Sequence, residues 1–354
     1  MAFDIRVLLD EASRRSRGLT DFGDDAFRPA LERLLSSLDG EARLSAAGRE
    51  MLTARIIELL RNRLVLEDHI RRHPDILEEE NENPIVIVGL PRTGTTLLQR
   101  ILSCDPRLYP MLWWECRYPA PLQADAAPGE DPRVALARAE VRAMIEANPA
   151  LLAIHPFDAE AADEEGMLME HSFMSFFDSY ADIPGYTSWL WSHDQTPAYR
   201  HLKRMLKFLQ WQKRRRGIAA QRWVLKAPHH LRQIDVLFKV FPDARVVYAH
   251  RDPIKARASV THLLGTLYWM RSDKPFDAAA LRYLLLCLCW NGPGRAHVEP
   301  AELTGLRLEL NAETQHGVTT AVIVPLDFGT VLHPVLEEVT AALALAATGD
   351  DGEL

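Results

Sequence analysis

An eight-residue turn between an apolar run and a helical segment constrains the fold of this chain more than any other feature. The apolar run covers residues 84–88, and the turn, residues 89–96, reads Gly-Leu-Pro-Arg-Thr-Gly-Thr-Thr. A strand, a glycine turn and a helix in this order are typical of a phosphate-binding loop. The reason is that a helix N-terminus offers unpaired N–H groups and a partial positive charge to an anion.

The turn departs at one position from the loop of nucleoside triphosphatases. That loop has a lysine directly after its second glycine, which reaches the β- and γ-phosphates, whereas this chain has Thr95. The turn therefore suits a phosphate but suits triphosphate cleavage poorly. A nucleotide kinase or other P-loop phosphotransferase stays an alternative, although the sequence also offers no clear magnesium-binding aspartate after a strand.

Two further strand-to-helix units follow later in the chain. Apolar runs over residues 222–226 and 244–250 each precede a segment with helical spacing. Strands that alternate with helices predict an α/β fold, with a P-loop-like parallel β-sheet flanked by helices. Ligands of such sheets bind beyond the carboxyl ends of the strands, so the turn, Lys226 and Arg251 are expected to converge there.

The pattern divides the chain into three parts. Residues 1–80 read as a helical N-terminal layer, in which Leu52, Ile56, Leu59 and Leu60 recur at helical spacing. Residues 81–290 form the α/β core, including a helical insertion over 120–220 that we interpret as a substrate lid. Residues 291–354 form an atypical C-terminal segment, in which 318–324 is expected to be one more strand and 335–347 a helix.

Composition limits the functions that the chain can have. The 354 residues are 47% hydrophobic and 25% charged, and the formal net charge of -8 argues against nucleic acid as a main partner. The four cysteines are scattered, which argues against a zinc site or a disulfide framework and fits reduced thiols. Neither a signal peptide nor a transmembrane segment is recognisable, so we expect a cytoplasmic protein.

Three motifs, taken in order, resemble those of a known family. They are the turn at 91–96, Trp-Val-Leu-Lys-Ala-Pro-His-His at 223–230, and residues 241–253, which lead through His-Arg-Asp-Pro to Ser259. The chain resembles the sulfotransferases that use 3′-phosphoadenosine 5′-phosphosulfate (PAPS), especially a bacterial branch related to tyrosylprotein sulfotransferases. The resemblance covers roughly residues 10–275. It implies the sulfotransferase fold and in-line transfer of a sulfuryl group from PAPS to an acceptor hydroxyl or amine, without a metal.

The resemblance also implies which residues hold the donor. Its phosphosulfate end would be bound by the turn, and its 3′-phosphate by Arg251 and Ser259. The residue types fit these roles, because hydroxyls, backbone N–H groups and a guanidinium all donate hydrogen bonds to phosphate oxygens. The turn residues with this role are Arg92, Thr93, Gly94, Thr95 and Thr96.

Three residues are predicted to act in the transfer itself. Glu115 is the expected base, because the family has a glutamate in a similar position and two neighbouring tryptophans could raise its pKa by desolvation. Lys226 is expected to steady the transferring group or the leaving phosphate. His230 could contact substrate, share in proton transfer or cap its helix, and His229 is less favoured. His171 is either a lid residue facing the pocket or a packing histidine.

The acceptor and the C-terminal part of the fold are open at this point. Small molecules, lipids, sugars and peptides all remain possible acceptors. Relatives continue past residue 275 with a Tyr-Glu-Asp-Leu-like motif that this chain does not have. A catalytically inactive nucleotide-binding relative is therefore a further alternative.

Overall fold

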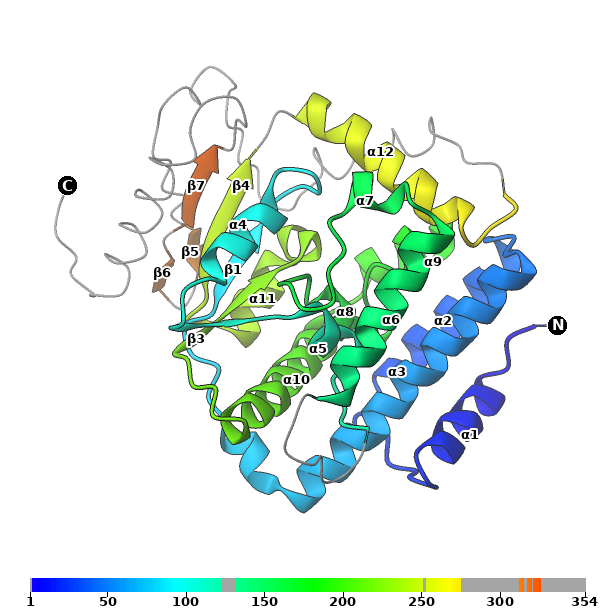
Figure 1. Ribbon diagram of the computed structural model, residues 1–354, viewed down its shortest axis with the longest axis horizontal. Coiled ribbons are helices and arrows are strands. Elements are labelled where there is room, and N and C mark those ends of the chain that lie inside the picture. The colour runs from blue at the N-terminus through cyan, green and yellow to red at the C-terminus, as the bar shows by residue number, and fades with distance from the viewer. Residues whose placement is uncertain are drawn as a thin grey trace, which may run out of the picture.

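The chain folds around a five-stranded parallel sheet. The computed structural model describes residues 2–122, 131–250, 253–274, 312–314, 317–319 and 321–325. The strands of the sheet lie in the order β2-β3-β1-β4-β7, and every neighbouring pair is parallel (Figure 1). The strands are β1 (Ile85–Val88), β2 (Leu108–Pro110), β3 (Arg222–Lys226), β4 (Arg245–His250) and β7 (Ala321–Pro325).

The register of the sheet places Lys226 beside the carboxyl end of β1, where the glycine turn begins. Ile87 of β1 lies opposite Lys226 of β3 on one side and opposite Val247 of β4 on the other. All four residues of β1 are apolar and buried, as expected for a parallel strand that is covered on both faces. The α/β fold with a parallel sheet and flanking helices is therefore confirmed. The carboxyl ends of β1, β3 and β4 lie side by side, next to the turn that follows β1.

The first part of the chain is helical, as its periodicity predicts. It forms α1 (Ile5–Arg15), α2 (Phe27–Gly40) and α3 (Ala46–Arg72), followed by the 3-10 helix η1 (Pro74–Glu78). Helix α3 begins where the Ser45 side chain accepts a hydrogen bond from the Gly48 N–H at 3.0 Å. Leu52, Ile56, Leu59 and Leu60 are all buried on the inner face of α3.

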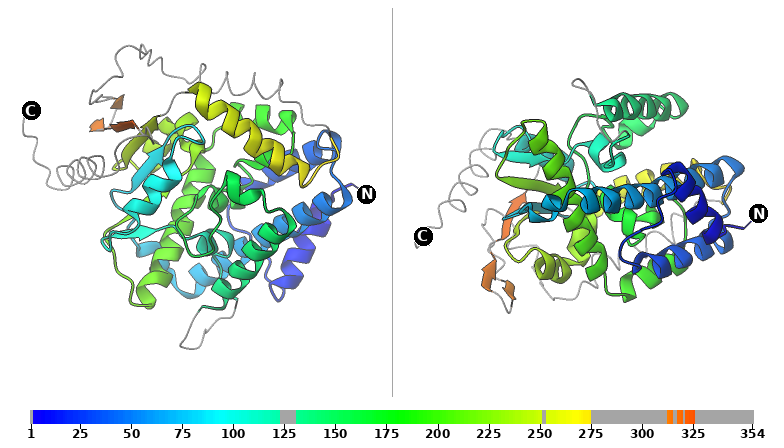
Figure 2. Two further views of the ribbon diagram at one scale, coloured as in Figure 1. Left: turned by 45° about the horizontal axis from the view of Figure 1, so that its top comes forward. Right: turned by 90° about the horizontal axis from the view of Figure 1, so that it is seen from below.

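A helical insertion separates β2 from β3. The described residues between 131 and 221 contain no strand. In both views of Figure 2 the sheet and the blue N-terminal helices lie toward opposite sides of the molecule. A single hydrophobic cluster extends from the N-terminal helices through the insertion to β1, β3 and β4. The helices of this part are α5 (Trp113–Arg117), α6 (Pro132–Ala147), α7 (Leu151–Ile154), α8 (Gly166–Met169), η2 (Glu170–Ser172), η3 (Phe177–Ser179), α9 (Pro184–Ser192) and α10 (Thr196–Arg215).

Helices also connect the core strands, as the alternating pattern predicts. They are α4 (Thr95–Leu102) after β1, η4 (Pro228–Arg232) and α11 (Ile234–Val240) after β3, and α12 (Pro253–Trp269) after β4. The strand expected over 318–324 is observed as two pieces. Residues of β7 pair with β4, whereas β6 (Gly317–Thr319) pairs with β5 (Ala312–Thr314) in an antiparallel hairpin. The helix expected over 335–347 lies outside the described residues.

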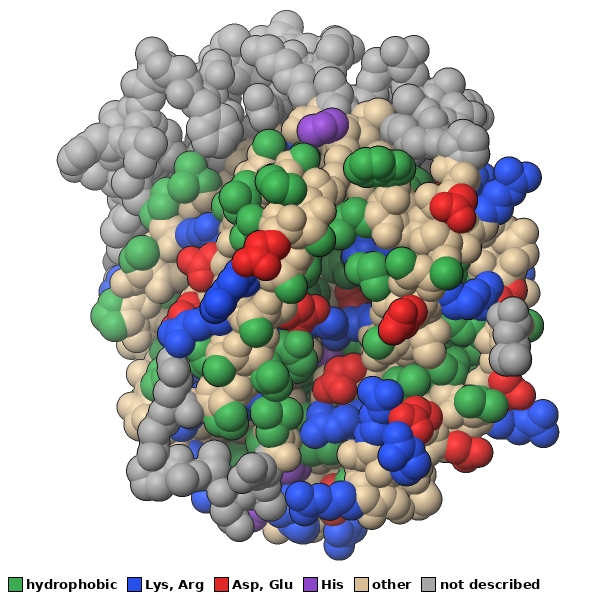
Figure 3. Space-filling model, turned by 45° about the vertical axis from the view of Figure 1, so that its right-hand side comes forward, with side chains coloured by type: hydrophobic (Ala, Val, Ile, Leu, Met, Phe, Trp, Pro, Cys, Tyr) green, Lys and Arg blue, Asp and Glu red, His purple; other side chains and the backbone are tan. Residues whose placement is uncertain are grey.

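Among the described residues, no helix combines the length and the apolar character that crossing a membrane requires. On the face drawn in Figure 3, Lys and Arg side chains lie among Asp and Glu side chains rather than in one large basic patch.

Candidate active site

The turn between β1 and α4 packs closely against the neighbouring strand β4. Gly94 is the N-cap of α4 and has φ 92°, and Arg92 has φ 71°, both in the left-handed region. A Cβ atom on Gly89 would lie 2.6 Å from the Ala249 carbonyl oxygen and 3.0 Å from Thr93 Oγ1. The glycines therefore allow a compact turn whose backbone N–H groups, at the start of α4, can approach an anion.

Replacing Gly89 by alanine tests this packing. We expect G89A to lose about 1–3 kcal/mol of unfolding free energy, because the new methyl group would have to displace β4. Urea unfolding measures the change. The control is G40A, since a Cβ atom on Gly40 would meet nothing within 4 Å. Equal midpoints for the two variants would contradict the close approach.

The three threonines of the turn have different environments. Thr93 is fully buried, and its Oγ1 donates to the Leu90 carbonyl oxygen at 2.7 Å, which holds the turn closed. Thr96 is half-buried and faces the end of β3, where its Oγ1 accepts a hydrogen bond from Lys226 Nζ at 3.2 Å. Thr95 is buried beside them. Thr96 is thus the hydroxyl that the turn shares with the neighbouring strand.

Arg92 reaches from the turn to two other elements. Its Nε donates to Ser259 Oγ of α12 at 2.8 Å, and its Nη1 donates to the Ile154 carbonyl oxygen at the end of α7. The structure therefore brings Arg92 and Ser259 together, although the resemblance implies roles for them at different ends of the donor. Arg251 lies outside the described residues.

Lys226 ends β3 as a buried cation. Its side chain is 0% exposed, and its Nζ lies 2.5 Å from Glu164 Oε1 in addition to its bond to Thr96. Its backbone N–H donates to Glu165 Oε2 at 2.6 Å. A buried ammonium requires an anion, and here Glu164 supplies it. Sequence reasoning did not find these glutamates, although the acidic run at 163–165 was a signal within the insertion.

His230 is held on both ring nitrogens. Nε2 lies 2.5 Å from Glu165 Oε1, and Nδ1 lies 2.8 Å from the hydroxyl of Tyr199. A carboxylate only accepts, so we assign a proton to Nε2. Burial, followed by the charge of Glu165, raises the Tyr199 pKa well above its ordinary value, so this hydroxyl keeps its proton. The ring therefore holds Glu165 in place, and Glu165 in turn holds the backbone of Lys226.

The other two histidines singled out in the sequence are packing residues. His229 Nε2 lies 2.5 Å from Gln195 Oε1, and burial, with His230 and Arg232, lowers the His229 pKa to about 3. His171 is 0% exposed, with Nδ1 2.9 Å from the Leu168 carbonyl oxygen and Nε2 3.1 Å from Asn62 Nδ2. Burial, followed by the charge of Arg55, holds its pKa well below the ordinary value. Of the two interpretations left open for His171, the structure favours packing.

Glu115 lies in a different ion pair from the one at Lys226. Its side chain is buried, and Oε1 is 2.7 Å from Lys213 Nζ and 3.4 Å from Arg216 Nη2. Lys213 Nζ in turn lies 5.6 Å from the ring centroid of Trp223, near the start of β3. Since Lys226 ends that strand, none of the described contacts brings Glu115 to the lysine.

A histidine–aspartate pair adjoins the Lys226 cluster. His155 Nε2 lies 2.9 Å from Asp163 Oδ2, and Asp163 Oδ1 accepts the backbone N–H of Glu164 at 2.7 Å. Burial alone would raise the pKa of Asp163, but the charge and hydrogen bond of His155, together with Lys226, lower it to about 2. Asp163 is therefore ionised. The sequence analysis did not single out either residue.

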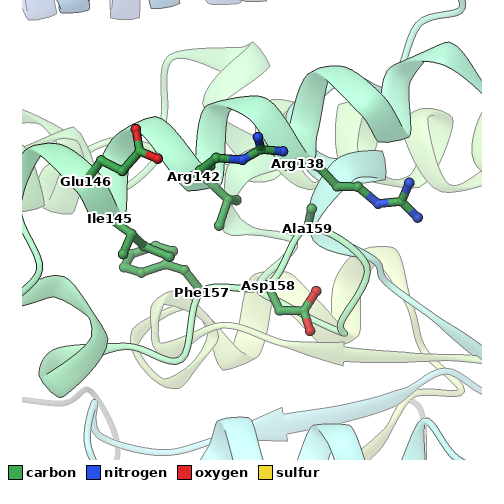
Figure 4. A pocket seen from close by; sticks show the side chains of 8 residues that line it. Arg138, Arg142, Ile145, Glu146, Phe157, Asp158 and Ala159 are labelled. Carbon is green, nitrogen blue, oxygen red and sulfur yellow. The ribbon is translucent and has the colours of Figure 1, made fainter.

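A surface groove lies next to this pair, between α6 and residues 157–159 (Figure 4). Its volume is about 490 Å³, and Figure 4 shows the Phe157 ring beneath Ile145. The same ring is 4.6 Å, centroid to centroid, from that of His155. Its apolar lining residues are Val141, Ile145, Phe157 and Ala159, and its charged ones are Arg138, Arg142, Glu146 and Asp158.

The chemistry of the site suits an oxyanion. The turn, Thr96 and Lys226 supply donors and one buried positive charge, and this charge is balanced by Glu164. Within the described part of the chain, no group of three or more His, Cys, Asp or Glu side chains is arranged to hold a metal ion.

Comparisons with known proteins find sulfotransferases. The chain is 30% identical, over 190 residues, to omega-hydroxy-beta-dihydromenaquinone-9 sulfotransferase Stf3 of Mycobacterium bovis and of Mycobacterium tuberculosis. This match covers 52% of the chain and 46% of each relative, so the chain spans about half the length of the curated relatives it matches.

Two solved sulfotransferase structures share the fold. STF1 of Mycobacterium tuberculosis H37Rv superposes with a TM-score of 0.72 and 26% identity, covering 98% of this chain and 88% of that one. STF9 of Mycobacterium avium gives 0.67 and 29%, covering 77% and 70%. A model of the Sulfotransferase family matches residues 84–287, a span that includes the turn, Lys226 and Ser259. The chain therefore belongs to the sulfotransferase family.

Proposed function

We propose that the protein transfers a sulfuryl group from PAPS to an acceptor hydroxyl or amine. The observation that supports this most strongly is the buried Lys226 ammonium at the end of β3, which donates a hydrogen bond to Thr96 of the glycine turn. A cation and a hydroxyl beside a helix N-terminus stabilise an oxyanion that moves between two oxygen atoms. Membership of the sulfotransferase family makes that oxyanion a sulfuryl group rather than a phosphoryl group.

The residues present fit this donor. PAPS, when bound, would supply the sulfuryl group and the phosphate that leaves. We propose that the N–H groups at the start of α4 and the Thr96 hydroxyl bind the phosphosulfate end, and that Ser259 and Arg251 bind the 3′-phosphate. Lys226 stabilises the negative charge of the transition state, and Glu164 holds the ammonium in position. We propose no metal requirement.

A proton acceptor is also needed, because the acceptor hydroxyl loses its proton during transfer. The sequence predicts a carboxylate, Glu115, for this step. Its bond to Lys213 instead favours a structural role. We propose that a group nearer Lys226 accepts the proton. A cytoplasmic location of the reaction stays a prediction.

We propose a hydroxylated lipid or other apolar alcohol as the acceptor to be tested first, ahead of sugars and peptides. Two observations support this choice: the curated relatives carry the name of a hydroxylated menaquinone, and half of the residues that line the groove beside His155 are apolar. The test is transfer of ³⁵S from labelled PAPS to a panel of long-chain alcohols, phenols, sugars and tyrosine peptides. Label on none of them, from folded protein that binds the donor, would support the inactive relative instead.

The thermal shift with different nucleotides separates the two nucleotide-binding functions. We expect adenosine 3′,5′-bisphosphate at 100 times its Kd to add about 2.7 kcal/mol of stability. We expect ATP with magnesium to add little, because Thr95 replaces the lysine that triphosphates require. Stabilisation by ATP with magnesium alone would favour the kinase alternative.

A further inference from the structure

We propose that His155 is the proton acceptor of the transfer and that Asp163 positions it. This inference rests on the proposed function, since it assigns a role within the same site. Neither residue follows from the motifs that carry the family resemblance. His155 directly follows Ile154, whose carbonyl oxygen contacts Arg92 of the glycine turn. Its partner Asp163 directly precedes Glu164, the partner of Lys226.

The pair has the orientation that a base requires. Asp163 is buried, and its Oδ2 lies 2.9 Å from His155 Nε2, so the carboxylate accepts a hydrogen bond from the Nε2–H group. This fixes the ring tautomer and leaves the Nδ1 lone pair as the acceptor. No hydrogen bond between described residues uses that Nδ1. The side chain of His155 is 17% exposed, so the ring is not sealed from a ligand.

Asp163 is itself held rigidly. Its N–H donates to the Met111 carbonyl oxygen at 2.8 Å, and its carbonyl oxygen accepts from Gln99 Nε2 at 2.8 Å. Its second carboxylate oxygen accepts the N–H of Glu164. Each polar group of this residue therefore has a partner, and the aspartate can define the position of the imidazole to within a narrow range.

The segment that carries His155 is tied to the donor-binding turn. The carbonyl oxygen before the ring, of Ile154, accepts from Arg92 Nη1 of the turn. The carbonyl oxygen after it, of Pro156, accepts from Arg100 Nη2 of α4 at 2.6 Å. The charged groups around the ring are thus Arg92, Arg100 and Asp163, with the Glu164–Lys226 pair beyond the aspartate. The backbone on both sides of His155 is thus bound to the turn and to α4, and its partner Asp163 directly precedes the partner of Lys226.

The nearby carboxylates are less suited to take the proton. Protonating Glu164 would break its ion pair with Lys226, the cation that the transition state needs. Both oxygens of Glu165 are already bound, one by the Lys226 backbone and the other by His230. Glu115 is bound to Lys213. The His155 ring, in contrast, can accept a proton at Nδ1 without breaking either ion pair.

The proton of the acceptor moves to His155 as the sulfuryl group is transferred. The acceptor oxygen forms its bond to sulfur as its proton moves to His155 Nδ1. The bond between sulfur and the bridging oxygen of the donor breaks, and its electron pair leaves with that oxygen on the 5′-phosphate of adenosine 3′,5′-bisphosphate. The imidazolium beside the Asp163 carboxylate is a stabilised ion pair, and it releases its proton to solvent after the products leave.

The test compares H155A with a control at an exposed histidine, H193A, using the first alcohol of the panel that accepts ³⁵S, or water as the acceptor if none does. We expect kcat of H155A to fall about 10²–10⁴-fold, while the Kd of adenosine 3′,5′-bisphosphate changes less than about threefold. We expect added imidazole to restore part of the activity of H155A. In the wild type, the plot of kcat against pH should have a rising limb, where one group loses its proton. This limb should be absent in H155A. H193A should match the wild type, since His193 is exposed and contacts the Trp189 carbonyl oxygen.

D163N gives a second, independent measurement. An amide in this position no longer enforces the Nε2–H tautomer, so we expect a lower kcat and a shifted pH limb, with unchanged bisphosphate affinity. Retention of kcat and of the pH limb in H155A would overturn the inference, as would loss of the same limb in E164Q instead. If the wild type transfers no label even to water, the proposed function fails, and the inference fails with it.

Discussion

Replacing Lys226 by methionine is expected to lower the rate of sulfuryl transfer by about 10²–10³-fold. Methionine fills a similar volume in the buried position at the end of β3 but carries no charge to stabilise the oxyanion. The backbone bond from residue 226 to Glu165 stays available, so the strand and the turn should keep their positions. Single-turnover transfer of ³⁵S from labelled PAPS measures the effect on chemistry alone.

The matched control is K239M. Lys239 lies on α11 and donates from Nζ to Thr196 Oγ1, away from the turn. We expect K239M to transfer label at the wild-type rate and K226M to keep its affinity for adenosine 3′,5′-bisphosphate within about tenfold. Wild-type turnover in K226M would contradict the assignment of the cation.

Breaking the Glu115–Lys213 pair is expected to have the largest effect on stability. The side chains are 1% and 2% exposed, so E115Q leaves a buried ammonium without its closest counter-charge. Removal of one partner of a buried ion pair typically costs about 3–5 kcal/mol. Urea unfolding of E115Q, K213M and the double variant measures the loss for each change and the coupling between them.

The double variant E115Q/K213M is the control for the charge. We expect it to be more stable than E115Q alone, because it leaves no unpaired ammonium next to Trp223. At a temperature where E115Q is folded, we expect its transfer rate to stay within about threefold of the wild type. A steep loss of turnover at unchanged stability would instead support Glu115 as the base.

The sequence predicted the parallel sheet and the parts of the site that come from local patterns. The glycine turn, Lys226 and Ser259 each lie at a strand end or on the following helix, so their motifs identify both the element and its place in the sheet. The apolar spacing of α3 likewise reflects one buried helix face. Such features depend on residues close together in the chain.

The parts that the sequence did not predict depend on distant residues. β2 has only three residues and ends in a proline, too short for any periodicity, and it exists because it pairs with β3. Glu164 and Asp163 gain their roles only when the insertion folds onto Lys226, 62 positions after Glu164, and onto Gln99, 64 positions before Asp163. Glu115 has local surroundings typical of a base, but its partner Lys213 comes from the far end of α10.

Calorimetric titration of the folded chain with adenosine 3′,5′-bisphosphate tests whether the turn and Lys226 form a binding site for a sulfuryl donor. We predict one saturable site with a Kd on the order of micromolar, and binding of PAPS that is weakened in K226M. The absence of saturable heat with both PAPS and the bisphosphate, from protein that unfolds cooperatively, would contradict this account.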